Sequence, residues 1–190
     1  MATEQELSDF LKSVEKRAFK RAVWQVRDDD AALDIVQDSM LKLAQRYGDR
    51  PAQELPLLFQ RILANQTMDW FRRQKTRDAH LASAADLIGG DEEEGGPDAL
   101  EVLQAIAGAE AAAESAETSL SRREVLRLIE KALQELPARQ REAFLLRYWE
   151  ELDVAETAAV MGCSVGSVKT HCSRATQALA RTLQAQGISP

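Results

Sequence analysis

Two cysteines and two histidines are few for a chain of 190 residues, and only 5% of its residues are aromatic. Cys163 and Cys172 are therefore expected to be small buried residues rather than parts of a disulfide framework. His171, next to Cys172, does not complete a set of four metal ligands, so we expect no metal site. The apolar runs are too short to cross a bilayer and no secretory signal begins the sequence, which favours a cytoplasmic protein.

The motifs of common enzymes are also missing. The sequence has no glycine-rich loop ending in Gly-Lys-Ser/Thr, and no combination of serine, cysteine and histidine typical of a nucleophile with its base. We therefore expect neither an enzyme nor a bound cofactor. The length allows one large or two small domains, and 45% apolar residues with few aromatics favour small helical bundles. The predicted fold class is all-α.

The net charge of −7 is distributed unevenly. Residues 78–120 contain eleven acidic and no basic side chains, including the stretch GGDEEEGGPD, which cannot bury enough apolar surface to fold alone. Residues 1–77 have 14 basic and 12 acidic side chains, and residues 122–190 have 10 and 8, so each end carries a net charge of +2. We interpret 78–120 as a long acidic flexible linker between two small helical domains, 1–77 and 121–190. The mild positive charges predict modest attraction to DNA phosphates.

Apolar residues recur at helical spacing in three stretches of the first domain. The aspartates at 28–30 separate the first two helices and can cap the second, and a loop over 48–56 with two prolines precedes the third. The three stripes are Phe10, Val14, Ala18 and Ala22; Val36, Met40 and Leu43; and Leu58, Phe59, Ile62, Leu63 and Trp70.

Two of these helices also have distinctive polar residues. On the second, Asp34, Asp38 and Lys42 lie at four-residue steps with Gln37 adjacent, which alone predicts no more than an intrahelical charge ladder. The third combines amide, carboxylate and aromatic side chains with a basic cluster, a mixture suited to single-stranded or distorted DNA. An alternative places its tryptophan in the core and explains its basic residues by the helix dipole. The residues concerned are Asn65, Gln66, Asp69, Trp70, Arg72, Arg73, Lys75 and Arg77.

The segment from Val154 to Ala178 predicts a helix-turn-helix. Residues 155–161 form one short helix, Gly162 can adopt a positive φ at the corner, and Ser164 can cap a second helix. The predicted shared core is Val160, Met161, Val165, Val168 and Cys172. The residues left for solvent or a DNA groove are Ser164, Ser167, Lys169, Thr170, His171, Ser173 and Arg174. A helical hairpin that binds nothing is the alternative.

Two upstream helices complete a four-helix domain. Ser121 and Glu124 resemble a capping box at the start of an amphipathic helix that includes Leu128 and Leu136. Pro137 suits the first turn of the next helix, which is expected to end near Trp149.

Three segments, in the right order, resemble extracytoplasmic function sigma factors of the bacterial sigma-70 family. They are ALDIVQDSMLKL (32–43), FQRILANQTMDWFRRQK (59–75) and LPARQREAFLLRYWEELDVAETAAVMGCSVGSVKTHCSRA (136–175). The resemblance implies sigma region 2 in residues 1–77 and sigma region 4 in residues 121–190. It also implies a protein that directs promoter recognition and DNA melting for transcription initiation, without catalysis.

The resemblance assigns roles to the candidate residues. Asp34, Gln37, Asp38 and Lys42 would bind the clamp coiled coil of RNA polymerase. The third helix would read and melt the minus-ten element, and the loop 48–56 would form a pocket for an unstacked base. The contact residues of the third helix would be Asn65, Gln66, Asp69, Trp70, Arg72, Arg73 and Lys75. The exposed residues of the helix-turn-helix would read the minus-thirty-five element, with Lys169 and Arg174 as the best candidates for guanine or phosphate contact.

The implied partners are core RNA polymerase, contacted at its clamp and flap regions, promoter DNA and an anti-sigma factor, with no direct insertion into a membrane. The composition of the linker predicts a solvated tether. The resemblance implies the alternative that the linker threads into the basic active-site cleft of polymerase. Two other interpretations stay open. One is a regulator with a response-regulator-type output domain, which the helical stripes of residues 1–77 disfavour because a receiver domain is α/β. The other is a polymerase-binding protein that does not read DNA.

Overall fold

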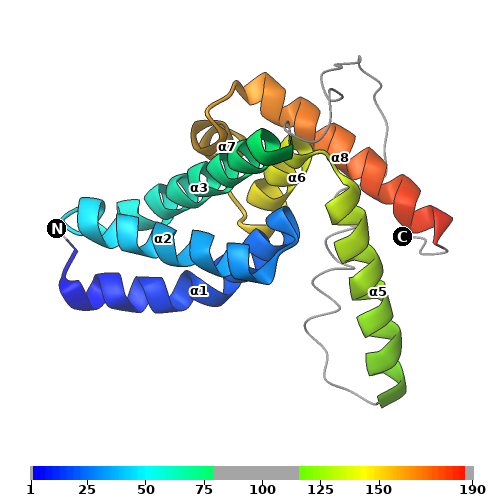
Figure 1. Ribbon diagram of the computed structural model, residues 1–190, viewed down its shortest axis with the longest axis horizontal. Helices are drawn as coiled ribbons and strands as arrows, with labels where there is room; N and C mark the ends of the chain where they lie inside the picture. The colour runs from blue at the N-terminus through cyan, green and yellow to red at the C-terminus, as the bar shows by residue number, and fades with distance from the viewer. Residues whose placement is uncertain (1, 79–115, 187–190) are drawn as a thin grey trace. The chain divides into compact units, whose positions relative to one another are not determined.

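The computed structural model describes residues 2–78 and 116–186, and within both ranges the regular secondary structure is helical (Figure 1). The predicted all-α fold class is confirmed. The chain divides into two compact units, one containing α1 to α3 and the other most of the helices from α5 onward. Most of the segment interpreted as a linker, 78–120, lies outside the described residues. In the two described ranges, no helix is both long and apolar enough to span a membrane.

The first unit consists of α1 (Glu4–Val26), α2 (Asp29–Tyr47), the short 3-10 helix η1 (Ala52–Glu54) and α3 (Leu55–Asp78). Polar side chains fix the starts of its first two helices. Thr3 and Glu6 form a capping box at α1, and Asp28 caps α2 by accepting a hydrogen bond of 2.8 Å from the backbone N–H of Ala31. The predicted aspartate cap of the second helix is confirmed.

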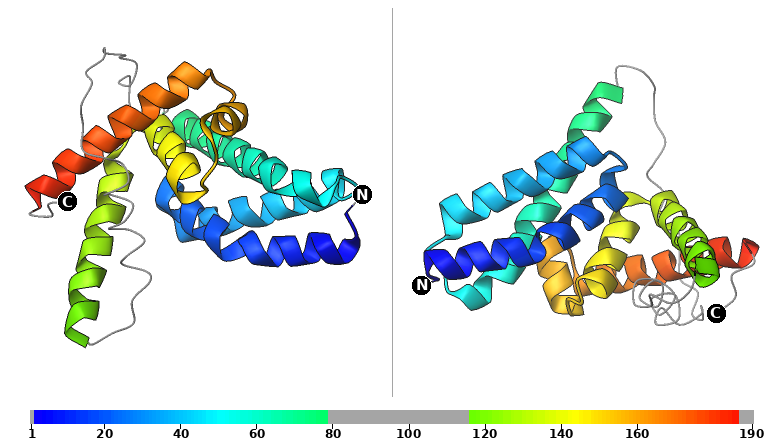
Figure 2. Two further views of the ribbon diagram at one scale, coloured as in Figure 1. Left: turned by 180° about the vertical axis from the view of Figure 1, so that it is seen from behind. Right: turned by 90° about the horizontal axis from the view of Figure 1, so that it is seen from below.

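The core of the first unit lies where α1, α2 and α3 face one another, and α1 and α2 lie side by side in both views of Figure 2. Phe59 is fully buried and meets Phe10 edge to face, with ring centroids 6.0 Å apart. The predicted stripes are confirmed. Their buried members are Ala18, Ala22, Val36, Leu43, Phe59 and Leu63, and Phe10, Val14, Met40, Leu58, Ile62 and Trp70 pack against the core.

A polar contact is buried in the same unit. Arg21 of α1 donates to Oε1 of Gln60 of α3, and both side chains are buried. A guanidinium removed from water needs hydrogen-bond acceptors, because an uncompensated buried charge is costly. The contact joins two helices whose residues are 39 positions apart in the sequence.

The loop predicted over 48–56 is shorter than expected. Ala52–Glu54 forms η1, and α3 begins at Leu55, so Leu55 and Pro56 belong to the first turn of α3. Proline is compatible with this turn because a backbone N–H there would have no intrahelical acceptor. Leu55 is buried, and the burial of this side chain favours the earlier helix start.

The second unit contains α5 (Ala116–Glu135), α6 (Ala138–Phe144), the π-helical segment η2 (Leu145–Trp149), the first five residues of α7 (Val154–Met161) and α8 (Val165–Ala185). Both α5 and α6 pack against α8. Arg139 donates to the buried carboxylate of Glu142 at 2.8 Å. The expected helix end near Trp149 is confirmed, although the final turn is π-helical. The largest buried apolar side chains are Ile129, Leu133, Phe144, Leu145, Leu146 and Leu179.

The start predicted for the first helix of this unit is wrong. α5 begins at Ala116, five residues before Ser121, so Ser121 and Glu124 lie within the helix and do not form its N-terminal capping box. Alanine and glutamate are strong helix formers, and AETSL extends the helix upstream of the predicted cap.

Candidate nucleic-acid interface

The turn between α7 and α8 is fixed by local hydrogen bonds. Gly162 has a φ of +64°, which an L side chain rarely adopts, and Ser164 caps α8 by accepting a bond of 3.0 Å from the N–H of Ser167. The predicted corner glycine and serine cap are confirmed. A second cap, not predicted from the sequence, lies at the start of α7, where the side chains of Asp153 and Glu156 each accept from the other residue's N–H. The spacing D-x-x-E indicates such a capping box.

One predicted core residue of the helix-turn-helix is exposed. Val160, Met161, Val168 and Cys172 are buried as expected, but Val165 is 43% exposed. Val165 is the first residue of α8, and the buried stripe of this helix begins three residues later at Val168. Periodicity alone does not show where along a helix its packing begins.

The candidate DNA-contacting residues of α8 differ in accessibility. Ser164, Lys169, Thr170 and Ser173 are exposed, whereas Ser167, His171 and Arg174 are half-buried. Because Thr170 and Ser173 are three residues apart and Lys169 and Ser173 four apart, these side chains share one face of α8. This face combines hydroxyl groups with one exposed cation, which can contact phosphates and base edges.

The half-buried His171 and the buried Cys172 of α8 have shifted pKa values. Burial lowers the pKa of His171, and the positive charges of Arg139 and Arg174 lower it further. Burial raises the pKa of Cys172 to about 11, against a smaller opposing effect of Arg147. The imidazole and the thiol are therefore both uncharged at neutral pH.

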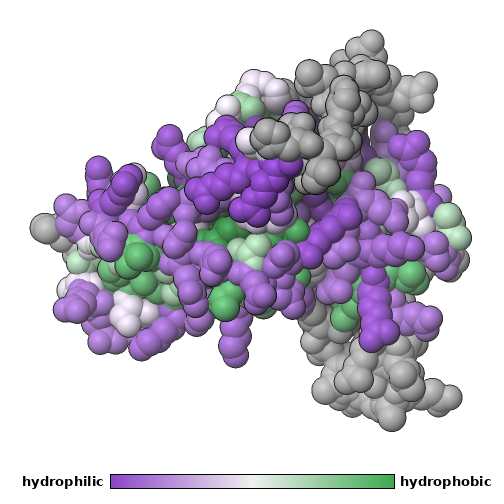
Figure 3. All heavy atoms as spheres, in the orientation of Figure 1, coloured by the Kyte–Doolittle hydropathy of each residue, from purple (hydrophilic) through white to green (hydrophobic). Residues whose placement is uncertain are grey.

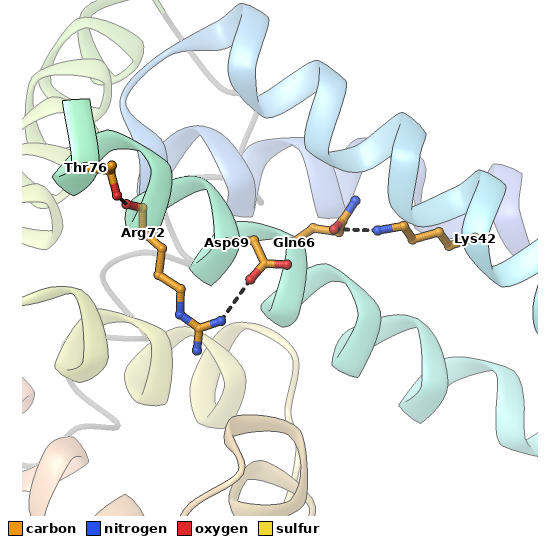
Figure 4. Close-up of polar contacts among 5 residues, drawn as sticks. All are labelled: Lys42, Gln66, Asp69, Arg72 and Thr76. Atoms are coloured by element: carbon orange, nitrogen blue, oxygen red, sulfur yellow. Dashed lines mark hydrogen bonds and ion pairs between the residues drawn. The ribbon is translucent and has the colours of Figure 1, made fainter.

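The candidate residues of α3 divide between two sides of the helix. Asn65, Asp69 and Arg72 follow one side, where Asp69 and Arg72 form an exposed ion pair at 2.9 Å. Gln66 points toward α2 on the other side (Figure 4). Trp70 and Arg73 follow Gln66 at helical spacing. A single surface cannot include all of the α3 residues that sequence analysis grouped together.

A groove of about 480 Å³ separates part of α2 from the C-terminal half of α3. Carboxylates line the α2 side, and two guanidinium groups line the α3 side. Trp70, on the α3 side, packs partly against the core, as the alternative interpretation of this residue predicted. The charged lining residues are Asp28, Asp30, Asp34, Asp38, Arg73 and Arg77.

The four candidate polymerase contacts on α2 also have different environments. Asp34, Gln37 and Asp38 are exposed, but Lys42 is half-buried and its Nζ donates to Oε1 of Gln66 on α3 at 2.7 Å. This hydrogen bond joins a predicted polymerase contact to a predicted DNA contact. The sequence pattern had indicated only neighbours within one helix.

Two exposed leucines on α2 were not among the residues predicted from the sequence. Leu33 is 43% and Leu41 55% exposed, and they lie four residues before and after Gln37. Figure 3 shows separate apolar patches among hydrophilic side chains over the first unit. The signal was available, because neither leucine belongs to the predicted buried stripe. Exposed leucines at this spacing, next to Asp34 and Asp38, give the outer face of α2 the mixed character of a protein interface.

The side chains that most often hold a metal ion are those of His, Cys, Asp and Glu. Within 2–78 and 116–186, no three His, Cys, Asp or Glu side chains are grouped so as to hold an ion.

Residues 126–179 match the family model of Sigma-70, region 4. The RNA polymerase sigma-E factor of Streptomyces avermitilis is 23% identical over 184 residues, covering 96% of this chain and 88% of that protein. The ECF RNA polymerase sigma factor SigM of Mycobacterium tuberculosis is 28% identical over 158 residues, covering 83% and 66%. The chain is an extracytoplasmic function sigma factor of the sigma-70 family.

A solved structure is similar to almost the whole of this sigma factor. The sigma factor RpoE from Bartonella quintana, crystallised in complex with the anti-sigma factor NepR, is 25% identical, with a TM-score of 0.61 over 95% of this chain and 96% of that one. The region 4 match contains the turn at Gly162 and the exposed face of α8. The α2 and α3 faces lie outside that match and inside the longer alignment with the sigma-E factor, which covers 96% of the chain.

Proposed function

We propose that this sigma factor binds core RNA polymerase through α2 and reads promoter DNA through two separate helices, α8 and α3. The observation that carries the proposal is the helix-turn-helix with a region 4 match in a chain that resembles sigma factors over almost its whole length. In this proposal residues 1–77 act as region 2 and residues 121–190 as region 4. The protein contributes binding rather than catalysis, and it works in the cytoplasm, where polymerase and promoter DNA are found.

The exposed face of α8 reads the minus-thirty-five element as duplex. Ser164 and the α8 N-terminus direct free N–H groups toward the phosphate backbone. Lys169, Thr170 and Ser173 reach base edges or phosphates in the major groove, whose width admits a helix. Ser167, His171 and Arg174, which are half-buried, support this face from its sides.

The α3 helix captures unstacked bases of the minus-ten element. On one side of α3 the exposed Asn65 offers an amide and Arg72 a cation, on the other side Arg73 offers a cation, and Lys75 adds a further exposed cation to contact the single-stranded backbone. Asp69 holds Arg72 in place through their 2.9 Å pair. Unstacking a base costs a few kcal/mol, which contacts to the strand and to polymerase must offset.

Polymerase docks on the outer face of α2. Asp34, Gln37 and Asp38 supply polar contacts, and Leu33 and Leu41 supply apolar area next to them. A partner with basic and apolar side chains complements this face. Since each end of the chain has a net charge of only +2, we expect weak DNA binding by the free protein and specific binding by the holoenzyme.

An anti-sigma factor is a further proposed partner. The support is the structure of the similar Bartonella quintana sigma factor, which was solved in complex with one.

The test is specific transcription by core polymerase plus this protein on a promoter library randomised at both elements. We expect Lys169→Ala to lower transcription at least several-fold on promoters with the preferred minus-thirty-five element. Lys131→Ala, which removes an exposed lysine from α5, is the matched control and is expected to transcribe like the wild type. Polymerase binding without promoter preference would support the non-reading interpretation instead, and absence of polymerase binding would refute the proposal.

A further inference from the structure

The contact between Lys42 and Gln66 bears on how α3 presents its side chains. The two residues are 24 positions apart in the sequence and both are half-buried, and Nζ of Lys42 lies 2.7 Å from Oε1 of Gln66 (Figure 4). Lys42 is therefore directed across to α3, while Asp34, Gln37 and Asp38 are exposed on α2.

The chemistry of the contact fixes the orientation of the glutamine amide. An ammonium group has three donors and no acceptor, so the atom that faces it must be the amide oxygen. The amide NH₂ group is then the end of Gln66 that remains for another partner. Without the ammonium, rotation about the last torsion of the side chain would exchange the two ends at little cost.

The α3 side of the groove around Gln66 suits a nucleic-acid base, whereas the α2 side carries the carboxylates of Asp28, Asp30, Asp34 and Asp38. Gln66 lines the groove next to α2 together with Trp70 and Arg73. These three side chains offer a hydrogen-bond donor, an aromatic surface and a cation, the groups that recognise single-stranded bases and their phosphates. A donor at this place favours a base that presents an acceptor.

We propose that Lys42 is a positioning residue that holds Gln66 with its NH₂ group toward an acceptor on one base of the melted promoter strand. Lys42 then acts in promoter reading through Gln66 and does not contact polymerase. The inference rests on the proposed function of α3 as the minus-ten reader. It goes further by assigning base preference at one position to a hydrogen bond between two helices.

The experiment uses the full chain with core polymerase and a promoter library randomised across the minus-ten element. We expect Lys42→Met to reduce open-complex formation about 3- to 10-fold on promoters with the preferred base at one position, because one hydrogen bond is lost there. On promoters with other bases at that position the change is expected to be small. Gln66→Leu is expected to flatten the preference at the same position, and the double variant to behave like Gln66→Leu alone.

Two further variants separate positioning from a purely structural role. Lys42→Arg keeps a donor toward Gln66 and is expected to restore most of the base preference. Lys12→Met removes an exposed lysine of α1 and is the matched control. Affinity for core polymerase, measured by competition with the wild type, is expected to be unchanged by Lys42→Met.

The inference is overturned by additive losses in the double variant, by loss of core binding in Lys42→Met, or by an effect that is equal for all bases. If the wild type itself showed no promoter preference with core polymerase, the proposed function would fail first, and the library would show this before any variant was compared.

Discussion

The two helices proposed to read the promoter, α8 and α3, are held in place by different kinds of contact. Around α8, the hydrogen bonds of the Asp153–Glu156 box and of the Ser164 cap join residues three positions apart. Around α3, the interhelical hydrogen bonds join residues 24 and 39 positions apart. The helix-turn-helix is thus encoded locally, whereas the α3 surface exists only after α1, α2 and α3 have packed.

This difference predicts where each surface is vulnerable. A change in one cap or in the corner glycine can disturb α8 alone. The α3 surface is expected to depend on core residues of other helices, because its side chains are positioned by α1 and α2.

The largest expected effect tests the dependence of α3 on its core. Phe59→Ala removes a fully buried ring that packs against Phe10, and it is expected to lower the free energy of unfolding by about 3–5 kcal/mol. Chemical denaturation followed by tryptophan fluorescence measures the loss. Phe71→Ala, at a half-buried position of the same helix, is the control and is expected to cost clearly less. Equal losses for the two variants would contradict the proposed core role of Phe59.

The next largest expected effect is the loss of stability when one helix cap is removed from each unit. Ser164→Ala and Asp28→Ala are each expected to cost about 1 kcal/mol, because each removes an acceptor for an N-terminal N–H group. Ser164→Asp keeps the acceptor and is expected to retain stability, but its negative charge is expected to weaken DNA binding if this end of α8 faces phosphates. Unchanged promoter binding by Ser164→Asp would argue against that orientation.

The corner glycine of the helix-turn-helix and the glycine that follows α2 give a comparison whose expected effects are similar to or smaller than those of the caps. Gly162→Ala is expected to cost about 1 kcal/mol, since its φ of +64° strains an L residue although no atom lies within 4 Å of an added Cβ. Gly48 has an ordinary φ of −61°, but an added Cβ would lie 2.7 Å from the backbone oxygen of Ala44. Asparagine tolerates the left-handed region, so it is expected to recover stability at 162 and not at 48. Thermal melts of the four variants check this, and recovery at both positions would refute the distinction.

The same contrast explains what the sequence could predict. Gly162, Ser164 and the aspartate cap at 28 follow from local rules, and the structure confirms them. The pairing of Lys42 with Gln66 could not be predicted, because it depends on how far apart α2 and α3 lie. The errors at Val165 and Ser121 concern the ends of helices, where packing and propensity beyond the motif decide the outcome.

The smallest expected effect is a difference in how pH changes stability. The pKa of His171 is lowered in the folded protein by burial and by Arg139 and Arg174, so the unfolded chain binds a proton more readily. Stability is therefore expected to fall as the pH drops through the ordinary histidine value of 6.5. In the first unit, hydrogen bonds from Thr3 lower the pKa of Glu6, so its contribution is lost only as the pH falls below 4.5.

His171→Asn separates these two pH ranges, because it removes the titrating imidazole and leaves Glu6 intact. Between pH 7.5 and 5.5 the variant is expected to lose less stability than the wild type, while the two curves run parallel at lower pH. Denaturant midpoints measured at half-unit pH steps are the readout. Parallel curves throughout would show that the environment of His171 does not couple its protonation to folding. A difference confined to the upper range would assign the near-neutral pH sensitivity to His171 in the helix-turn-helix.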